Sequence, residues 1–454
     1  MSAREAMRRG WCPSTLRPME TGDGWLVRLH PPGARLTPLQ LGKVAELAAA
    51  YGNGLVEISA RANLQIRGVS AASHPELVAA LLAEGLVDED GEGPQRVTLC
   101  SPLLPPPACG REGWGGGRES RSSASDRLTE RHCPPPRPSP PQAGGGRAAA
   151  LAEDIEAIAQ GLSGLPAKTG IVIDDGGPLP LDAFPADLRL LATVDGWRLG
   201  LPNGGWFGPM AHTEARDRVA RLLTMLRDRH AAEPAIRRMR DVPATFFQNA
   251  LAGLTPFDSP APRSPARMVG LFPDAIIANL PFGRTDSATL TSFAQSAEAA
   301  GTREICFSPW RGIACLGLSE RAGDTLLVKA RSLGLITDPD DPRLFLQACA
   351  GSPACARGEA PSMTDAAALA ETAAPLLRDG VRIHVSGCAK SCARPGASDL
   401  TLVGRDGRYG VVIGGTTRDG PIAELDLSDI LARLQPGGDI HARLLAGRAT
   451  GRGA

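Results

Sequence analysis

Four cysteines near the C-terminus are the strongest chemical signal in the sequence. Five residues separate Cys349 from Cys355, three separate Cys388 from Cys392, and 32 lie between the two pairs. Four thiolates in two close pairs form a complete ligand set for a [4Fe–4S] cluster or a structural zinc ion. Zinc hairpins favour two residues between paired cysteines, so the wider spacings favour the cluster. A zinc site and four unrelated buried thiols are the alternatives.

Small residues surround these cysteines. Ala350, Gly351, Ser352, Gly387 and Ala389 would let the backbone approach a cluster and offer N–H groups to its sulfurs. The other six of the ten cysteines lack ligand spacing, and we interpret them as structural or incidental. The chain shows no export signal, so the cysteines do not indicate a disulfide framework.

The composition argues against two broad classes of protein. The 454 residues carry 49 Lys and Arg against 49 Asp and Glu, a formal net charge of zero. A general nucleic-acid binder needs a surplus of cations, so no nucleic-acid partner is expected. No run approaches the roughly 20 apolar residues that span a bilayer. The first residues carry charges without the apolar stretch of a secretory signal. We therefore expect a cytoplasmic protein with no membrane partner.

An internal repeat with an offset of 249 residues organises the chain, beginning over residues 37–88. In the first copy, Thr37 caps a predicted helix that ends at Gly52. In the second copy, Asp286 caps the equivalent helix, which ends at Gly301. Apolar residues recur at helical spacing inside both segments, at the same offset. The agreement of caps, apolar stripes and stops indicates a duplication.

Each copy also contains three strand-like apolar runs and a second helix. The runs cover residues 25–30, 54–59 and 63–68 in the first copy and 275–280, 303–308 and 312–317 in the second. Each copy therefore predicts the order β-α-β-β-α, which is a ferredoxin-like half-domain.

The repeat resumes with an offset of 212, where DLRL at 187–190 matches DLTL at 399–402. The interval from the end of the second helix to this match is 101 residues in the first copy (86 to 187) and 64 in the second (335 to 399). The first copy therefore carries at least 37 extra residues. A stretch at about 102–147 is rich in Pro, Gly, Ser and Arg, which predicts a disordered insertion. Its Cys109 and Cys133 have no ligand spacing.

These landmarks divide the chain into five segments. We expect a first half-domain at 1–90, a flanking α/β domain without cluster ligands at 91–230, a linker at 231–264, a second half-domain at 265–338 and a cluster domain at 339–454.

The motifs resemble those of a known superfamily. Paired Cys-x5-Cys and Cys-x3-Cys motifs after a duplicated half-domain are similar to the sirohaem-dependent nitrite and sulfite reductases. Within that superfamily the chain resembles the precorrin-3B synthase family, through segments 8–33, 58–68, 308–317 and 384–395. The resemblance implies an α+β, pseudo-twofold fold. Two ferredoxin-like half-domains would pair, and two flanking α/β domains would pack around them.

The resemblance implies an oxygen-dependent enzyme that hydroxylates precorrin-3A at C20 and closes a lactone, giving precorrin-3B for cobalamin biosynthesis. It implies a tetrapyrrole bound between the halves, a [4Fe–4S] cluster that relays electrons and a mononuclear non-haem iron. NADH or another reductant, acting through an electron-donor reductase, would supply electrons, and no sirohaem is expected. The alternatives are a sirohaem-dependent nitrite or sulfite reductase and a non-catalytic iron–sulfur or tetrapyrrole-binding protein disabled by the insertion.

A precorrin carries several carboxylates, which the planar fork of arginine binds well. By resemblance, cations in matched motifs become candidate substrate contacts. They are Arg61, Arg67, Arg96, Lys168, Arg311 and Lys390.

The chain departs from the resemblance at three positions. Arg394 replaces a usual histidine after the last cysteine, Thr169 replaces an aromatic, and Val97 replaces an asparagine. The seven histidines form no evident triad with a carboxylate. The ligands of the mononuclear iron and the catalytic residues are therefore not assigned.

Overall fold

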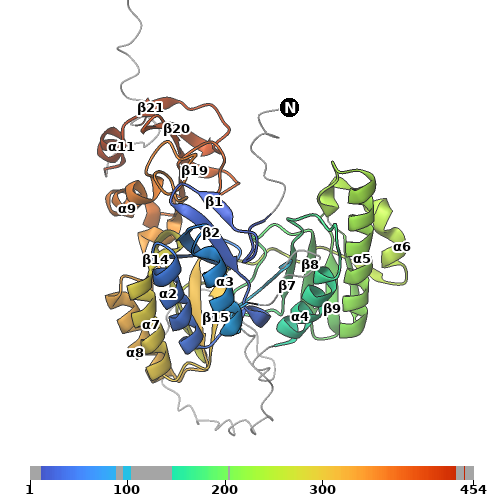
Figure 1. Cartoon of the computed structure of the whole chain (residues 1–454). Helices are drawn as coiled ribbons and strands as arrows, with labels where there is room; N and C mark the ends of the chain where they lie inside the picture. Colours follow the sequence, from blue (N-terminus) through green and yellow to red (C-terminus); the bar gives the residue numbers. More distant parts are fainter. Residues whose placement is uncertain (1–11, 88–95, 104–145, 203–204, 436–443, 445–454) are drawn as a thin grey trace, which may run out of the picture.

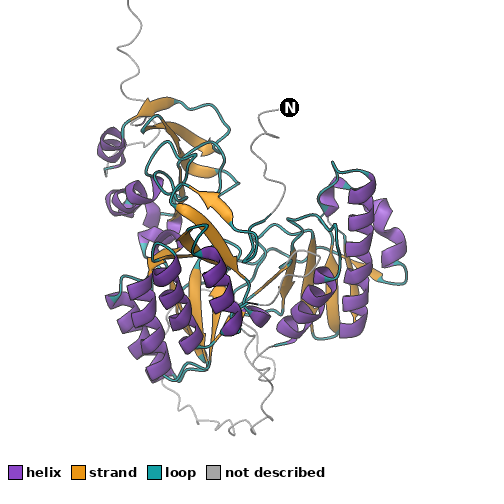
Figure 2. Ribbon diagram, viewed as in Figure 1, coloured by secondary structure: helices purple, strands orange, loops and turns teal. Residues whose placement is uncertain are grey.

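The computed structural model describes residues 12–87, 96–103, 146–202, 205–435 and 444. The described residues form four sheets, with two central sheets flanked by one on either side (Figures 1 and 2). Most of the predicted insertion, residues 104–145, lies outside the described residues. The two ends of the predicted segment belong to the fold instead. Leu103 is buried, and helix α4 (Arg147–Gln160) begins at Arg147.

The first repeat forms a sheet with two helices packed on it. Its elements are β1 (Met19–Thr21), β2 (Gly24–Leu29), α2 (Pro38–Tyr51), β4 (Leu55–Ile58), β5 (Leu64–Val69) and α3 (His74–Ala83). As predicted, Thr37 caps α2: its hydroxyl accepts the N–H of Gln40, whose side chain accepts the N–H of Thr37. Gly52 follows the helix, and the position requires glycine because a Cβ there would lie 2.4 Å from the carbonyl oxygen of Arg67.

The second repeat has the same order of elements. They are β12 (Gly270–Phe272), β13 (Ala275–Asn279), α7 (Ser287–Ala299), β15 (Glu304–Ser308), β16 (Gly312–Leu316) and α8 (Glu320–Ser332). Asp286 caps α7 by accepting the N–H of Thr289, again as predicted. The predicted β-α-β-β-α order is therefore present in both copies.

The two repeats exchange an edge strand, which the sequence did not predict. Strand β14 (Arg284–Asp286) of the second repeat pairs with β4, and β3 (Arg35–Leu36) of the first pairs with β15. Arg284 and Arg35 are equivalent in the repeat, and they form ion pairs across the exchange with Glu57 and Glu304. The two half-domains are therefore interlocked.

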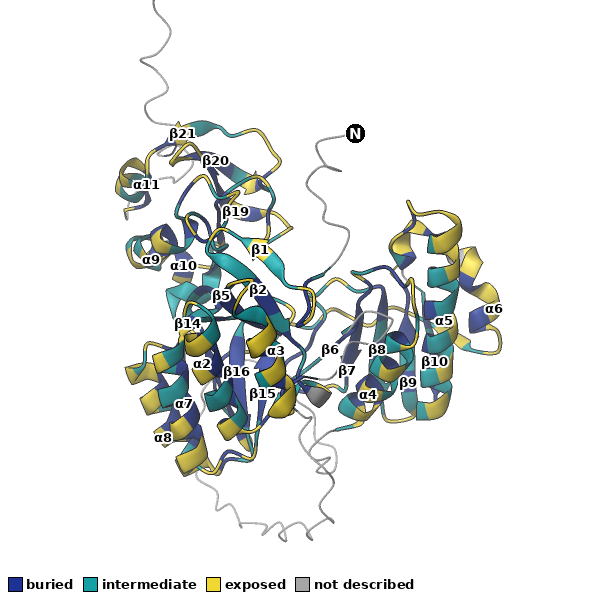
Figure 3. Cartoon of the chain, in the orientation of Figure 1, coloured by how far each residue is buried: buried dark blue, intermediate teal, exposed yellow. Residues whose placement is uncertain are grey.

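Helices α2 and α7 pack against each other and join the two central sheets. Leu41 and Val44 of α2 share one buried core with Leu290 and Phe293 of α7. Figure 3 shows buried strands behind helices whose outer faces are exposed. Among the described residues, no helix is both long and apolar enough to cross a membrane.

The flanking sheets repeat each other as well. In one, β6 (Thr98–Cys100), β7 (Ile171–Asp174) and β8 (Leu188–Thr193) are parallel, and β9 (Gly196–Gly200) is antiparallel. In the other, β17 (Leu346–Ala348), β18 (Ile383–Ser386) and β19 (Ser398–Arg405) are parallel, and β20 (Arg408–Gly415) is antiparallel. Ile171 pairs with Leu188 and Ile383 with Leu400, so the register reproduces the predicted offset of 212.

Further elements complete these two layers. They are β10 (Trp206–Met210), α5 (His212–Ala232), α6 (Gln248–Leu251) and β11 (Thr255–Phe257) in the first, and α9 (Ser362–Thr372), α10 (Ala374–Arg378), β21 (Ala423–Leu425) and α11 (Leu427–Leu434) in the second.

Most of the segment predicted as a linker, 231–264, packs into the first flanking layer. Met239 and Phe247 are buried in its core, and β11 pairs with β10. Apolar residues are scattered through the segment without helical or strand periodicity. Their burial therefore depends on the neighbouring layer, and local pattern did not reveal it.

Candidate functional site

The four grouped cysteines line one cavity of about 300 Å³, here called the cysteine pocket. Cys349 directly follows β17, and Cys388 follows β18 by two residues. These strands are parallel neighbours, so both loops leave the same edge of the sheet. Cys355 and Cys392 lie further along the same loops and also line the cavity. The structure therefore brings together the four predicted ligands.

The cysteine loops form a cradle that requires small residues. Gly351 has a φ of +63°, and a Cβ there would lie 2.4 Å from the hydroxyl oxygen of Ser362. A Cβ on Gly387 would lie 2.9 Å from the Cα of Gly351, so the two loops touch through glycines. The N–H of Gly387 donates to the sulfur of Cys349 at 3.1 Å. This is the contact expected of a backbone that wraps an iron–sulfur cluster.

The thiols also influence one another electrostatically. Burial raises the pKa of the Cys388 thiol, and the nearby Cys349 and Cys355 raise it further. Metal ions reverse this effect, because a coordinated thiol loses its proton. The residues present therefore fit a four-thiolate metal group.

The spread of the four cysteines bears on the choice between a cluster and a zinc ion. In the part of the chain that the structure describes, no three His, Cys, Asp or Glu side chains converge closely enough for one metal ion. A zinc ion holds all its thiolates at about 2.3 Å, whereas a cubane offers each thiolate its own iron. The four cysteines line one pocket without converging on a single point, which is compatible with a cluster. The same observation gives no fitting site for the mononuclear iron among the described residues.

Cations outnumber carboxylates around the cysteine pocket. The charged residues that line it are Arg28, Arg67, Arg311, Arg357 and Lys390 against Glu20 and Glu57. The sequence reasoning missed Arg28 and Arg357, although both lie in or beside segments that carried signals: Arg28 in the first repeated strand and Arg357 two residues after Cys355. The surplus of three positive charges suits a ligand that carries several carboxylates.

Three of the predicted cations line this pocket, but two of them already have protein partners. Arg67 is 3% exposed and donates four of its five N–H groups to Asp23, Glu57 and the carbonyl oxygen of Ala354. Arg311 donates to the carbonyl oxygens of Phe282 and Ala393. Lys390 is half-buried between two of the cysteines, and its ammonium has no hydrogen-bond partner among the described residues, so it is the cation best placed for a ligand.

Arg61 and Lys168 lie outside the walls of the cysteine pocket. Arg61 packs against Gly170 of the first flanking layer, where a Cβ would lie 2.2 Å from an Arg61 nitrogen. Lys168 is exposed two residues before that glycine. The structure thus brings these two predicted cations near each other, and neither lines the cysteine pocket.

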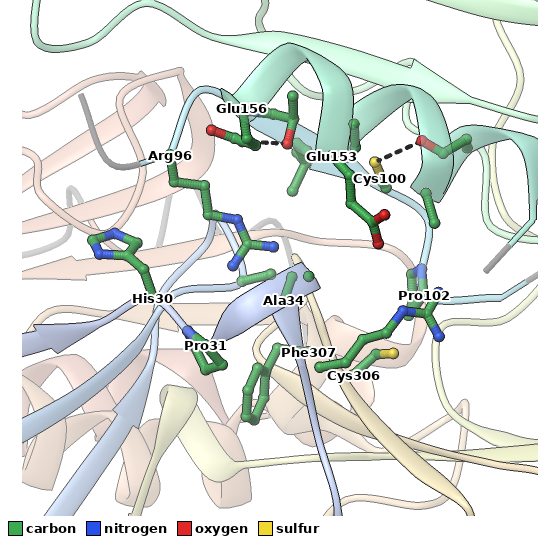
Figure 4. A pocket seen from close by; sticks show the side chains of 18 of the residues that line it. His30, Pro31, Ala34, Arg96, Cys100, Pro102, Glu153, Glu156, Cys306 and Phe307 are labelled. Atoms are coloured by element: carbon green, nitrogen blue, oxygen red, sulfur yellow. Dashed lines mark hydrogen bonds between the residues drawn. The ribbon is translucent and has the colours of Figure 1, made fainter. Parts of the chain in front are cut away.

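Arg96 lines a different cavity of about 240 Å³, here called the flanking pocket (Figure 4). The offset of 249 relates its walls to those of the cysteine pocket: Ala34 corresponds to Gly283, and Phe307 to Ile58. Ser101 follows β6 as Cys349 follows β17. The flanking pocket is therefore the pseudo-twofold counterpart of the cysteine pocket, without cluster ligands.

The two related pockets differ in charge. Arg35 and Arg96 line the flanking pocket together with three carboxylates, those of Glu153, Glu156 and Asp175. Figure 4 shows Arg96 and Glu153 both pointing into the cavity. The cation surplus of the cysteine pocket is absent here, so the structure separates Arg96 from the other predicted substrate contacts.

Comparison with known proteins agrees with this architecture. The nitrite/sulfite reductase ferredoxin-like half domain family matches residues 17–84. A precorrin-3B synthase of Sinorhizobium sp is 34% identical over 94% of this chain and 88% of that protein. A ferredoxin–nitrite reductase of Synechococcus elongatus is 24% identical over 87% of this chain and 79% of that protein. The structure of Mycobacterium tuberculosis NirA superposes with a TM-score of 0.66 and 18% identity, covering 93% of this chain and 83% of that one.

The duplicated half-domains, the flanking layers and the cysteine pocket define a protein of the nitrite and sulfite reductase superfamily, with the predicted pseudo-twofold α+β fold. Within that superfamily, 34% identity over nearly the whole of both chains indicates one branch. The chain belongs to the precorrin-3B synthase family.

Proposed function

We propose that this protein converts precorrin-3A into precorrin-3B by oxygen-dependent hydroxylation at C20 with lactone formation. The similarity to a precorrin-3B synthase over 94% of the chain is the observation that carries this proposal. One oxygen atom of O2 enters the product and the other leaves as water. A reductant such as NADH, acting directly or through a reductase, supplies the two electrons that this balance requires.

The cysteine pocket supports a tetrapyrrole as the substrate. Lys390 and Arg357 offer cations to carboxylates, and Arg28, which donates to the side chain of Gln65 and interacts with the Cys12 thiol, lines the same pocket. Apolar side chains of Leu26, Ile58 and Phe282 form part of the wall and would contact the macrocycle. A pocket with an apolar wall and a few convergent cations holds and orients an amphipathic acid.

Cys349, Cys355, Cys388 and Cys392 would hold a [4Fe–4S] cluster beside the substrate. When bound, the cluster supplies one-electron transfer. A cluster whose four irons all carry thiolates has no open coordination position. The chain's own residues therefore orient the macrocycle and shield the reacting carbon from water, while oxygen reacts elsewhere than at these four cysteines.

Isotope labelling tests the proposal. The protein is purified without oxygen, its iron and sulfide are assayed, and it is then supplied with precorrin-3A, a reductant and ¹⁸O2. We expect one labelled oxygen atom in the product by mass spectrometry and broad iron–sulfur absorption without sirohaem bands. A product that takes its new oxygen only from water would overturn the oxygenase assignment. Sirohaem bands together with rapid nitrite or sulfite reduction would favour the reductase alternative.

A further inference from the structure

We propose that the turn between β1 and β2, together with Arg67 and Arg311, clamps the two cysteine loops onto the half-domains. The clamp makes these residues positioning residues for the cluster rather than substrate contacts. This inference rests on the cluster assignment made above. It gives a role to two motifs within the segments that carry the family resemblance, Pro-Met-x-x-Gly-Asp-Gly at 18–24 and Pro-Trp-Arg at 309–311.

The first half of the clamp grips the loop that carries Cys355. A Cβ on Gly22 would lie 2.3 Å from the carbonyl oxygen of Pro353 and 2.9 Å from the carbonyl carbon of Cys355. The N–H of Gly22 donates to the carbonyl oxygen of Ala354 at 3.2 Å. Because those neighbours are backbone atoms, no other residue fits at Gly22 while the cysteine loop stays in place.

Arg67 holds the same loop through hydrogen bonds from its charged guanidinium. Its guanidinium binds both carboxylate oxygens of Asp23, at 2.9 and 2.6 Å, and also donates to the carbonyl oxygen of Ala354 at 2.6 Å. Glu57 takes a further N–H at 3.2 Å. A buried guanidinium is stable only when such partners satisfy it. One side chain thus ties the turn of the first half-domain to the residue before Cys355.

The second half of the clamp grips the loop that carries Cys392. Arg311 donates to the carbonyl oxygen of Ala393, the residue after Cys392, at 3.3 Å, and to that of Phe282 at 3.0 Å. Phe282 belongs to the second half-domain, yet it is buried in the core of the cluster domain. Both loops that carry cluster ligands are therefore held from outside their own domain.

Cluster retention in matched variants tests the clamp. Arg67→Lys keeps the positive charge but loses the planar guanidinium group. Gly22→Ala places a methyl group against the backbone of the loop that carries Cys355. Arg284→Lys is the control for the first, because Arg284 also pairs with Glu57 but makes no hydrogen bond to a cysteine loop among the described residues. Gly42→Ala is the control for the second, because its Cβ would meet Ala294 at an ordinary 3.7 Å.

We expect Arg67→Lys to lose iron to a chelator about tenfold faster than the native protein, as the loss of one charge-assisted hydrogen bond predicts. Gly22→Ala should also lose iron faster, because its methyl group displaces the backbone of the cysteine loop. Both controls should match the native rate. Equal rates in all five proteins, or equally fast loss from Arg284→Lys and Arg67→Lys, would overturn the clamp.

A second measurement needs no variant. Hydrogen exchange of the native protein, with and without its cluster, reports on the amides of residues 21–24. Cluster removal should increase exchange there, since the turn loses its ordered partner, and unchanged exchange would contradict the clamp. Iron retained by Cys349→Ser would show instead that the cluster assignment has failed, so the two failures are distinguishable.

Discussion

At the scale of single residues, Cys349 is the most constrained of the four proposed ligands. Its sulfur accepts the N–H of Gly387 and lies 3.3 Å from the hydroxyl of Ser362. A hydroxyl is a poor substitute for a thiolate on iron. We therefore expect Cys349→Ser to purify with little iron and sulfide. Cys100→Ser, in the flanking pocket, is the matched control and should retain both at the native level.

The buried His384, in the middle of β18, makes the stability of the folded protein depend on pH. It is fully buried, and neither ring nitrogen has a hydrogen-bond partner in the described residues. Burial, helped by the charges of Arg394 and Arg311, lowers its pKa from 6.5 to about 4. Between those values the unfolded chain binds more protons than the folded protein. Stability is therefore lost as pH falls through that window.

Replacing this histidine should remove part of that acid sensitivity. The depressed pKa corresponds to about 3 kcal/mol between pH 6.5 and 4. Denaturant unfolding of the native protein and His384→Gln at several pH values within this window measures the difference. We expect the free energy of unfolding to fall less steeply with acidification in the variant. Parallel curves for the two proteins would show that His384 does not titrate as its burial indicates.

At the scale of elements, the insertion can be separated from the fold at defined points. Leu103 packs in a core and α4 begins at Arg147, so a deletion should keep both and remove residues 104–145. The cost of closing a loop changes slowly with its length, so a short Gly-Ser replacement should be neutral or slightly stabilising. Thermal unfolding and iron content measure the result. An insoluble or cluster-free deletion variant would show that the segment is required.

Local sequence pattern was sufficient to predict the two helix caps but not the exchanged strands. Caps at Thr37 and Asp286 act within three residues, and both were predicted from the sequence. The exchanged strands β3 and β14 are only two and three residues long, and each pairs with a partner more than 200 residues away. Such short strands carry no periodicity, so their pairing follows from the packing of the two repeats.

At the scale of the whole molecule, duplication produced two related pockets, and charge distinguishes them. The cysteine pocket has a surplus of three cations, whereas carboxylates outnumber cations in the flanking pocket. We therefore expect one precorrin-3A per chain. Lys390→Ala should weaken its binding about tenfold, as the loss of one charge-assisted contact predicts. Arg96→Ala should leave the affinity nearly unchanged, despite its match to a superfamily motif.

Anaerobic absorbance titration with precorrin-3A measures both the affinity and the stoichiometry. A second equivalent of bound tetrapyrrole, removed by Arg96→Ala, would show that the flanking pocket also binds substrate.

The sequence alone was sufficient to group the four cysteines and to find the duplication with its two offsets, the helix caps and the family resemblance. These features depend on spacing and on contacts within a few residues, which a linear chain displays directly. Tertiary structure decided which cations remain free for a ligand. Arg67 and Arg311 looked like substrate contacts, but they meet carbonyl oxygens of loops 287 and 82 residues away. Arg96 matched the superfamily motif, yet packing placed it in the other pocket. An arginine's partners are set by whichever distant segments pack around it, and no local spacing encodes that choice.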